Sequence, residues 1–129
     1  MTVRGIDHFN IRASHELLEQ VRAFYCDVIG RVVGDRPPVD SAGYWLSAGD
    51  RDVLHHCLAG DDEQLASHVA TTLNHVALAC KGRAEMERKL AEFGVRFQMA
   101  RVPATNVTHL FLKDPAVNGI ELSFADEPA

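Results

Sequence analysis

The chain has 129 residues, of which 47% are hydrophobic and 24% charged, a length and a balance typical of one compact soluble domain. Its net charge of -5 gives no basic field, so a nucleic acid is not expected as a partner, and no apolar run is long enough to cross a membrane. The three cysteines are scattered without a CxxC pair, and the start of the chain has no signal-like apolar segment. These features predict reduced thiols and a cytoplasmic location.

The first half of the chain predicts the order strand, helix, strand, strand, strand. Alternating residues predict a strand over 3–12, and apolar residues at helical spacing predict a helix that begins after Ser14 and ends at Gly30. Three more strands are predicted at residues 31–35, 43–48 and 52–58. Together they form one βαβββ unit, module one, which spans residues 1–59.

A polar connector at residues 60–71, with room for one helical turn, leads into a second unit of the same order. The second unit has a predicted helix at 82–93, whose charged side chains are expected to form a solvated face. Its strands are predicted at residues 73–80, 95–101, 108–113 and 119–124. This is module two, residues 72–125, and the last residues of the chain are expected to fray. The sequence therefore predicts a single α+β domain made of two βαβββ modules.

Both modules begin with the same short phrase: an apolar residue, an acid or amide, a histidine and a further apolar residue. The two copies read Ile6-Asp7-His8-Phe9-Asn10-Ile11 and Leu73-Asn74-His75-Val76-Ala77-Leu78. The repeat puts one histidine at the same place in each half, as two-fold-related metal ligands require. His8 and His75 are therefore candidate ligands.

Strand alternation adds two further candidates. In the last strand Ile120, Leu122 and Phe124 form one apolar face, so Glu121 points to the other. In the strand at 52–58, the leucines pack in the same way and leave His55 on the matching face. If these strands curve around one cavity, His8, His55, His75 and Glu121 meet in it. Imidazoles and a carboxylate suit Zn, Ni, Co, Mn or Fe(II), and three protein ligands leave positions open for water and substrate.

The remaining histidines have different expected places. His55 is a fourth ligand, a catalytic base or a residue that lines the pocket. His56 lies on the apolar face of its strand and is expected to pack in the core. His109 either lines the cavity or is exposed, and His15 and His68 are expected at the surface.

Taken together, the motifs resemble the vicinal oxygen chelate superfamily, which includes glyoxalase I, bleomycin resistance proteins and extradiol dioxygenases. The matching segments extend over essentially the whole chain: Ile6-Asp7-His8, Phe24-Tyr25-Cys26-Asp27-Val28-Ile29-Gly30, Leu73-Asn74-His75-Val76-Ala77, Phe111-Leu112-Lys113-Asp114-Pro115 and Ile120-Glu121-Leu122. The resemblance implies paired βαβββ modules, a cupped mixed sheet around a divalent metal ion, and a homodimer.

The resemblance also implies roles for individual residues. The superfamily's ligand positions fall on His8, His75 and Glu121, and the fourth falls on His55, where glyoxalase I has a glutamate. The implied function is a metal-dependent lyase or isomerase of the glyoxalase or dioxygenase type. It would act on a small substrate chelated through adjacent oxygens, with Glu121 and His55 as the catalytic residues.

Two alternative functions remain open. One is an Fe(II) extradiol ring-cleavage dioxygenase, which shares the set of two histidines and one glutamate. The other is a metal-free ligand-binding protein of the bleomycin-resistance type. The intact ligand set disfavours this binding protein, because a cleft that only sequesters a ligand needs no metal-binding residues.

Overall fold

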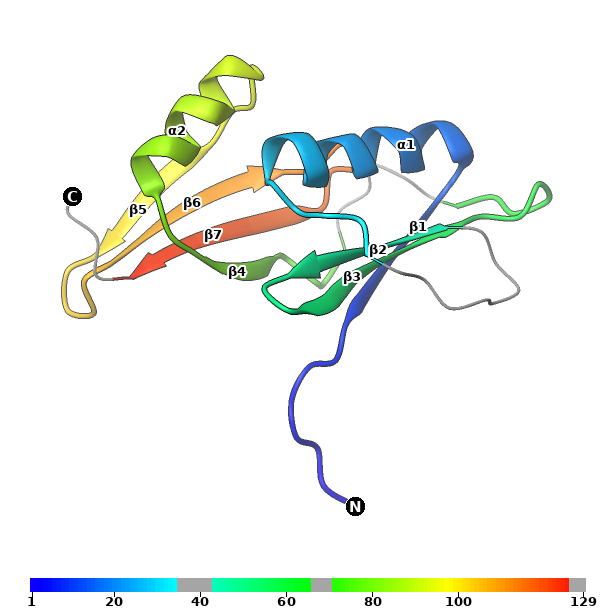
Figure 1. The fold of residues 1–129 in the computed structure, drawn as a ribbon, viewed down its shortest axis with the longest axis horizontal. Helices are drawn as coiled ribbons and strands as arrows, with labels where there is room; N and C mark the ends of the chain where they lie inside the picture. The colour runs from blue at the N-terminus through cyan, green and yellow to red at the C-terminus, as the bar shows by residue number, and fades with distance from the viewer. Residues whose placement is uncertain (35–42, 66–70, 126–129) are drawn as a thin grey trace. The chain divides into compact units, whose positions relative to one another are not determined.

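The computed structural model describes residues 1–34, 43–65 and 71–125 of the chain. It consists of two compact units, Met1–Ala66 and Ser67–Ala129, called here the N-terminal and C-terminal units. Their boundary lies within the predicted connector at 60–71, so each unit contains one predicted module. Each unit has a small sheet and a principal α-helix (Figure 1).

The N-terminal unit has a three-stranded mixed sheet. Its elements are β1 (Phe9–Ala13), α1 (His15–Ala23), η1 (Phe24–Val28), β2 (Gly43–Ala48) and β3 (Arg51–Leu58). The strand order is β1-β3-β2, with β1 parallel and β2 antiparallel to β3. Helix α1 begins after Ser14 as predicted, and one wider π-helical segment, η1, continues it towards Gly30.

The core of the N-terminal unit lies between α1 and one face of this sheet (Figure 1). Val21 and Tyr25 from the helical segment and Leu46 from β2 are completely buried. Burying an aliphatic or aromatic side chain of this size contributes about 1.5–3 kcal/mol. His56 is also fully buried, with its ring edge-on to that of Tyr25 at 5.8 Å, which confirms its predicted place in the core.

The C-terminal unit has a four-stranded mixed sheet. Its elements are β4 (Val76–Cys80), α2 (Arg83–Glu92), β5 (Gln98–Val102), β6 (Val107–Lys113) and β7 (Gly119–Ala125). The order is β4-β7-β6-β5, with β4 parallel to β7 and the other neighbours antiparallel. The α+β class is thus confirmed, and this unit has the predicted order strand, helix, strand, strand, strand.

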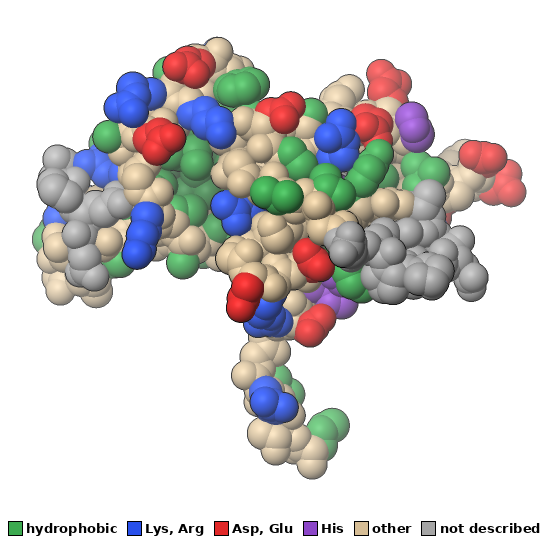
Figure 2. Space-filling view, viewed as in Figure 1, with side chains coloured by type: hydrophobic (Ala, Val, Ile, Leu, Met, Phe, Trp, Pro, Cys, Tyr) green, Lys and Arg blue, Asp and Glu red, His purple; other side chains and the backbone are tan. Residues whose placement is uncertain are grey.

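The predicted apolar face of the last strand is the core of this unit. Ile120, Leu122 and Phe124 are buried, as are Leu90 of α2 and Leu110 of β6. Acidic and basic side chains mingle over the outer surface of α2 (Figure 2). This mixture fits the solvated face that the sequence predicts. Within the described ranges, no helix combines the length and the hydropathy needed to span a membrane.

Four strand predictions differ from the structure, one of them being the strand expected at 95–101, which begins at Gln98. Residues 31–34 do not form a strand; they have only an isolated bridge between Val33 and Leu46. The strand expected at 3–12 begins at Phe9, and the one expected at 73–80 begins at Val76. Alternation in a sequence suits a strand, but a strand forms only where the backbone has a ladder partner. As a result His8 and His75 each immediately precede a strand.

Candidate functional site

Strand register shows that the two units are built alike around the candidate residues. In the N-terminal unit Asn10 of β1 pairs with His55 of β3. In the C-terminal unit Ala77 of β4 pairs with Glu121 of β7. His8 lies two residues before Asn10, and His75 lies two residues before Ala77. His55 and Glu121 therefore occupy equivalent positions relative to the repeated histidines.

The N-terminal pair forms a stack of aromatic rings. The His8 and His55 rings are 3.7 Å apart with an angle of 17° between their planes. Trp45 of β2, which pairs with His55 in the antiparallel ladder, lies parallel to the His55 ring at 4.1 Å. His55 thus has a ring contact with Trp45 as well as with His8, and only 8% of the residue is exposed.

The surroundings of His55 favour its neutral form. Burial, followed by the nearby His8, lowers the pKa of His55 below its ordinary value. Its Nε2 donates a hydrogen bond to the backbone oxygen of Asp52 at 3.2 Å, which leaves Nδ1 with the lone pair. A neutral imidazole of this kind can accept a proton or bind a metal.

The parallel stack also limits how His8 and His55 can bind one metal ion together. A metal ion lies in the plane of an imidazole that binds it, along the nitrogen lone pair. Two rings stacked face to face do not direct lone pairs at one nearby point. Binding of one ion by both His8 and His55 therefore requires one of the rings to turn.

In the C-terminal unit two imidazole rings lie close to the carboxylate of Glu121. Glu121 Oε2 lies 3.9 Å from His75 Nε2, near the spacing of about 3.4 Å expected for two ligands of one tetrahedral ion. Glu121 Oε1 lies 2.5 Å from Nδ1 of His109 on the adjacent strand β6. The Phe111 ring touches both imidazoles, edge-on to His75 and parallel to His109. His75, His109 and Glu121 thus gather on one face of this sheet.

The side chains of His75, His109 and Glu121 are suitable donors for a cation. The Nδ1 atom of His109 is buried and makes no hydrogen bond of ordinary geometry, although the Glu121 carboxylate is so close. Glu121 itself is only 8% exposed, and a buried carboxylate is costly unless it is paired or binds a metal. Imidazole and carboxylate donors fit the divalent metals that the sequence suggests. Across the described ranges, however, no three His, Cys, Asp or Glu side chains are already arranged to hold an ion.

His109 is the residue that sequence reasoning left undecided. Its neighbours Leu110 and Leu112 are buried on the apolar face of β6, so alternation places His109 on the opposite one. The signal that was missing is the register between strands. In the ladder Phe111 pairs with Glu121, which brings His109 diagonally next to the carboxylate.

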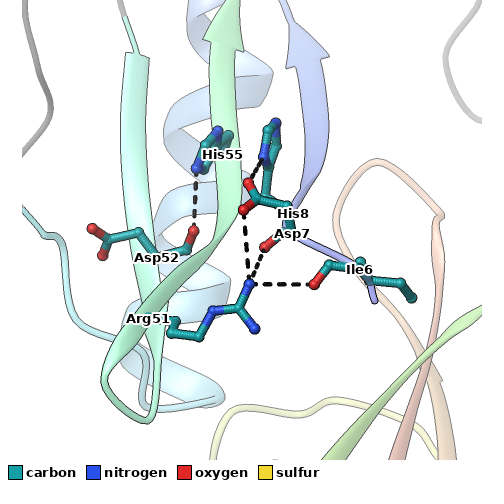
Figure 3. Close-up of polar contacts among 6 residues, drawn as sticks. All are labelled: Ile6, Asp7, His8, Arg51, Asp52 and His55. Atoms are coloured by element: carbon teal, nitrogen blue, oxygen red, sulfur yellow. Dashed lines mark hydrogen bonds and ion pairs between the residues drawn. The ribbon is translucent and has the colours of Figure 1, made fainter. Parts of the chain in front are cut away.

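The residue before each repeated histidine is also part of the arrangement. Asp7 Oδ2 accepts a hydrogen bond from His8 Nδ1 at 2.7 Å, and Asn74 Oδ1 accepts one from His75 Nδ1 at 2.8 Å. The bond from His8 lowers the pKa of the Asp7 carboxyl group below its ordinary value. Figure 3 shows Asp7 and His8 beside Arg51 and His55.

Comparison with known proteins gives the fold independently. No family model and no curated protein matches the sequence. A glyoxalase family protein from Bacillus anthracis superposes with a TM-score of 0.72 at 22% identity, over 98% of each chain. One from Enterococcus faecalis does so with a TM-score of 0.66 at 23% identity, over 95% of this chain and 99% of that one.

A third solved structure is a lactoylglutathione lyase from Agrobacterium tumefaciens, with a TM-score of 0.63 at 19% identity over 95% of each chain. These likenesses extend over nearly the whole chain and agree with the two related units that the register reveals. The chain therefore has the same fold as these glyoxalase-family structures.

Proposed function

We propose that this protein is a divalent-metal-dependent enzyme that acts on a small substrate bound through two adjacent oxygens. The observation that carries the proposal is the matched register: each unit brings its repeated histidine beside one further candidate, His55 in one unit and Glu121 in the other. A repeat that served only the fold would not need polar side chains at these matched positions.

In this proposal His8, His75 and Glu121 hold the metal ion. His8 and His75 would bind through Nε2, because the Nδ1 atom of each is engaged by its preceding residue. The ion supplies Lewis-acid polarisation of the substrate oxygens and stabilises negative charge that develops on them. Glu121 contributes the negative charge that a divalent cation prefers among its ligands.

His55 is the residue to which we assign proton transfer. It is buried, which favours its neutral form, and its Nδ1 lone pair is available while Nε2 donates to the backbone oxygen of Asp52. The Trp45 ring against one face restricts how the imidazole can move. A base held in this way accepts a proton at Nδ1 and returns it to a neighbouring atom of the substrate. Since glyoxalase I has a glutamate at this position, a glutathione hemithioacetal is not the substrate that we favour.

Metal analysis tests the proposal most directly. Protein purified without chelator is expected to contain about one equivalent of a divalent metal per chain. Glu121→Gln, which keeps the size but removes the charge, is expected to lose most of it. Asp62→Asn, a change at an exposed acid, is the matched control and is expected to keep it. Less than about a tenth of an equivalent in the unchanged protein would reject a metal enzyme and favour the metal-free binding protein.

A second candidate is an Fe(II) ring-cleaving dioxygenase. The ring stack favours it: if His55 is not a ligand, the remaining set is two histidines and one carboxylate, the facial triad of non-haem iron oxygenases. Iron in the purified protein, and oxygen uptake with catechol that depends on this iron, would support the dioxygenase. Bound zinc or nickel without oxygen uptake would support the proton-transfer enzyme.

We also propose a homodimer, as the resemblance implies. Light scattering during gel filtration tests it, since a dimer has twice the 14.2 kDa mass of the chain. A monomeric mass at micromolar concentration would reject it.

A further inference from the structure

The two copies of the repeated phrase share a second relationship besides their histidines. In both units, the residue immediately before the histidine holds the histidine's Nδ1 atom. The distance is 2.7 Å to a carboxylate oxygen of Asp7 and 2.8 Å to the amide oxygen of Asn74. The contact recurs although the two residues differ in charge, so the common feature is an oxygen acceptor.

An oxygen acceptor at Nδ1 determines where the imidazole carries its proton. A carboxylate or amide oxygen only accepts hydrogen bonds, so the ring must present Nδ1–H to it. In a neutral ring, the lone pair is then on Nε2. Outer hydrogen bonds of this kind fix the tautomer and the orientation of histidines that bind metals.

Asp7 precedes β1, so its backbone is not held by the ladder of strand hydrogen bonds and another contact must fix its position. Arg51, the first residue of β3, supplies it. One guanidinium nitrogen donates to the backbone oxygens of Ile6 and Asp7 at 3.3 and 3.2 Å, and it lies 3.8 Å from Asp7 Oδ1 (Figure 3). The arginine thus ties the segment before β1 to the adjacent strand, and Asp7 stays in reach of His8.

We propose that Asp7 and Asn74 are positioning residues, which hold His8 and His75 in the Nδ1–H tautomer so that Nε2 is free to bind. The purpose of this arrangement, metal binding, rests on the proposed function. The tautomer itself does not depend on a metal. The two halves are unequal: a carboxylate makes its imidazole a stronger donor than an amide does.

The tautomers are measurable in the metal-free protein by long-range nitrogen-proton NMR at about pH 8, where free imidazoles are neutral. His8 and His75 are both expected to show the Nδ1–H pattern. Asp7→Ala should shift His8 away from this pattern and leave His75 unchanged, and Asn74→Ala should do the reverse. Asp7→Asn keeps an acceptor and should restore the pattern. An Nε2–H pattern in the unchanged protein, or no response to Asp7→Ala, would overturn the inference.

Zinc affinity, measured by competition with a chelating dye, shows whether the positioning serves metal binding. Asp7→Ala and Asn74→Ala are each expected to weaken zinc binding about 10- to 100-fold, and Asp7→Asn less than Asp7→Ala. Asp62→Ala, at an exposed acid of the same unit, is the matched control and should leave the affinity unchanged.

The two measurements separate the inference from the proposed function. If zinc does not bind but the tautomers respond as expected, the proposed function fails and the positioning role stands. If zinc binds equally well to all variants and the tautomers do not respond, the inference fails and the proposed function stands.

Discussion

Nδ1 of His109 lies 2.5 Å from Oε1 of Glu121, on the adjacent strand of the C-terminal sheet. The two residues are diagonal neighbours in the β6–β7 ladder, and both side chains are largely buried. His109 is therefore the nearest side-chain neighbour of this buried carboxylate, closer than His75, whose Nε2 lies 3.9 Å from Oε2. The sequence did not decide where this histidine points, so the pair leads to the first prediction.

His109→Phe is expected to destabilise the metal-free protein by about 1–3 kcal/mol, because Glu121 loses its partner while remaining buried. Chemical denaturation measures the loss. His15→Phe, at an exposed histidine, is the matched control and should change the stability little.

A double-mutant cycle with Glu121→Gln shows whether the loss comes from this pair. A neutral amide is less costly to bury than a carboxylate, so His109→Phe should cost less in the Glu121→Gln background. An equal cost in both backgrounds would mean that His109 contributes only packing.

The second prediction concerns pH. The pKa of His55 is lower in the folded protein than its ordinary value of 6.5, mainly because of burial. The unfolded chain therefore binds more protons than the folded one as pH falls through this range, and His55 contributes stability that is present above about pH 6.5 and lost below it.

Denaturation midpoints between about pH 5 and pH 8 test this contribution. The unchanged protein should lose more stability towards acid pH than His55→Gln, which has no group that titrates there. Parallel curves for the two proteins would contradict the lowered pKa.

The third prediction concerns the connector. Arg12 of β1 holds Glu63 through two hydrogen bonds of 2.7 and 2.6 Å, and Glu63 also accepts one from the backbone of Gly60 at 3.2 Å. Because these bonds tie the connector to the sheet, Arg12→Gln should make residues near 60–65 more sensitive to limited proteolysis. The exchanged pair Arg12→Glu with Glu63→Arg should restore part of the resistance. If Arg12→Gln is cleaved no faster than the unchanged protein, the contact does not order the connector.

The fourth prediction concerns the turn that precedes β7. Val117 has a φ of 65°, in the left-handed region, which costs an ordinary side chain about 1–2 kcal/mol. Glycine adopts this conformation freely but also gains freedom in the unfolded chain. Val117→Gly is therefore expected to raise the free energy of unfolding by about 0.5–1 kcal/mol.

The control for this change is Val102→Gly, at another exposed valine, which lies in β5. Val102 ends β5 and has no positive φ for glycine to relieve, while glycine loses more backbone freedom on folding, so this variant should be less stable than the unchanged protein. A loss of stability in Val117→Gly as well would show that the side chain of Val117 matters more than its strained backbone.

Much of the fold follows from the sequence alone. The helix beginning after Ser14, the apolar face of Ile120, Leu122 and Phe124, and the order of module two depend on the spacing of apolar residues, which is local information. The repeated phrase placed His8 and His75 at equivalent points for the same reason. Where the pattern extended beyond a partner strand, at residues 3–8, alternation by itself predicted a strand that did not form.

Only the tertiary structure decided which polar side chains meet. Contact between His109 and Glu121, and between Trp45 and His55, depends on the register between strands that are separate in the sequence. Register results from many packing and hydrogen-bonding choices made together, so no single segment encodes it. The acid and the amide before the repeated histidines were visible from the start, but their bonds to Nδ1 emerged only once the backbone was in place.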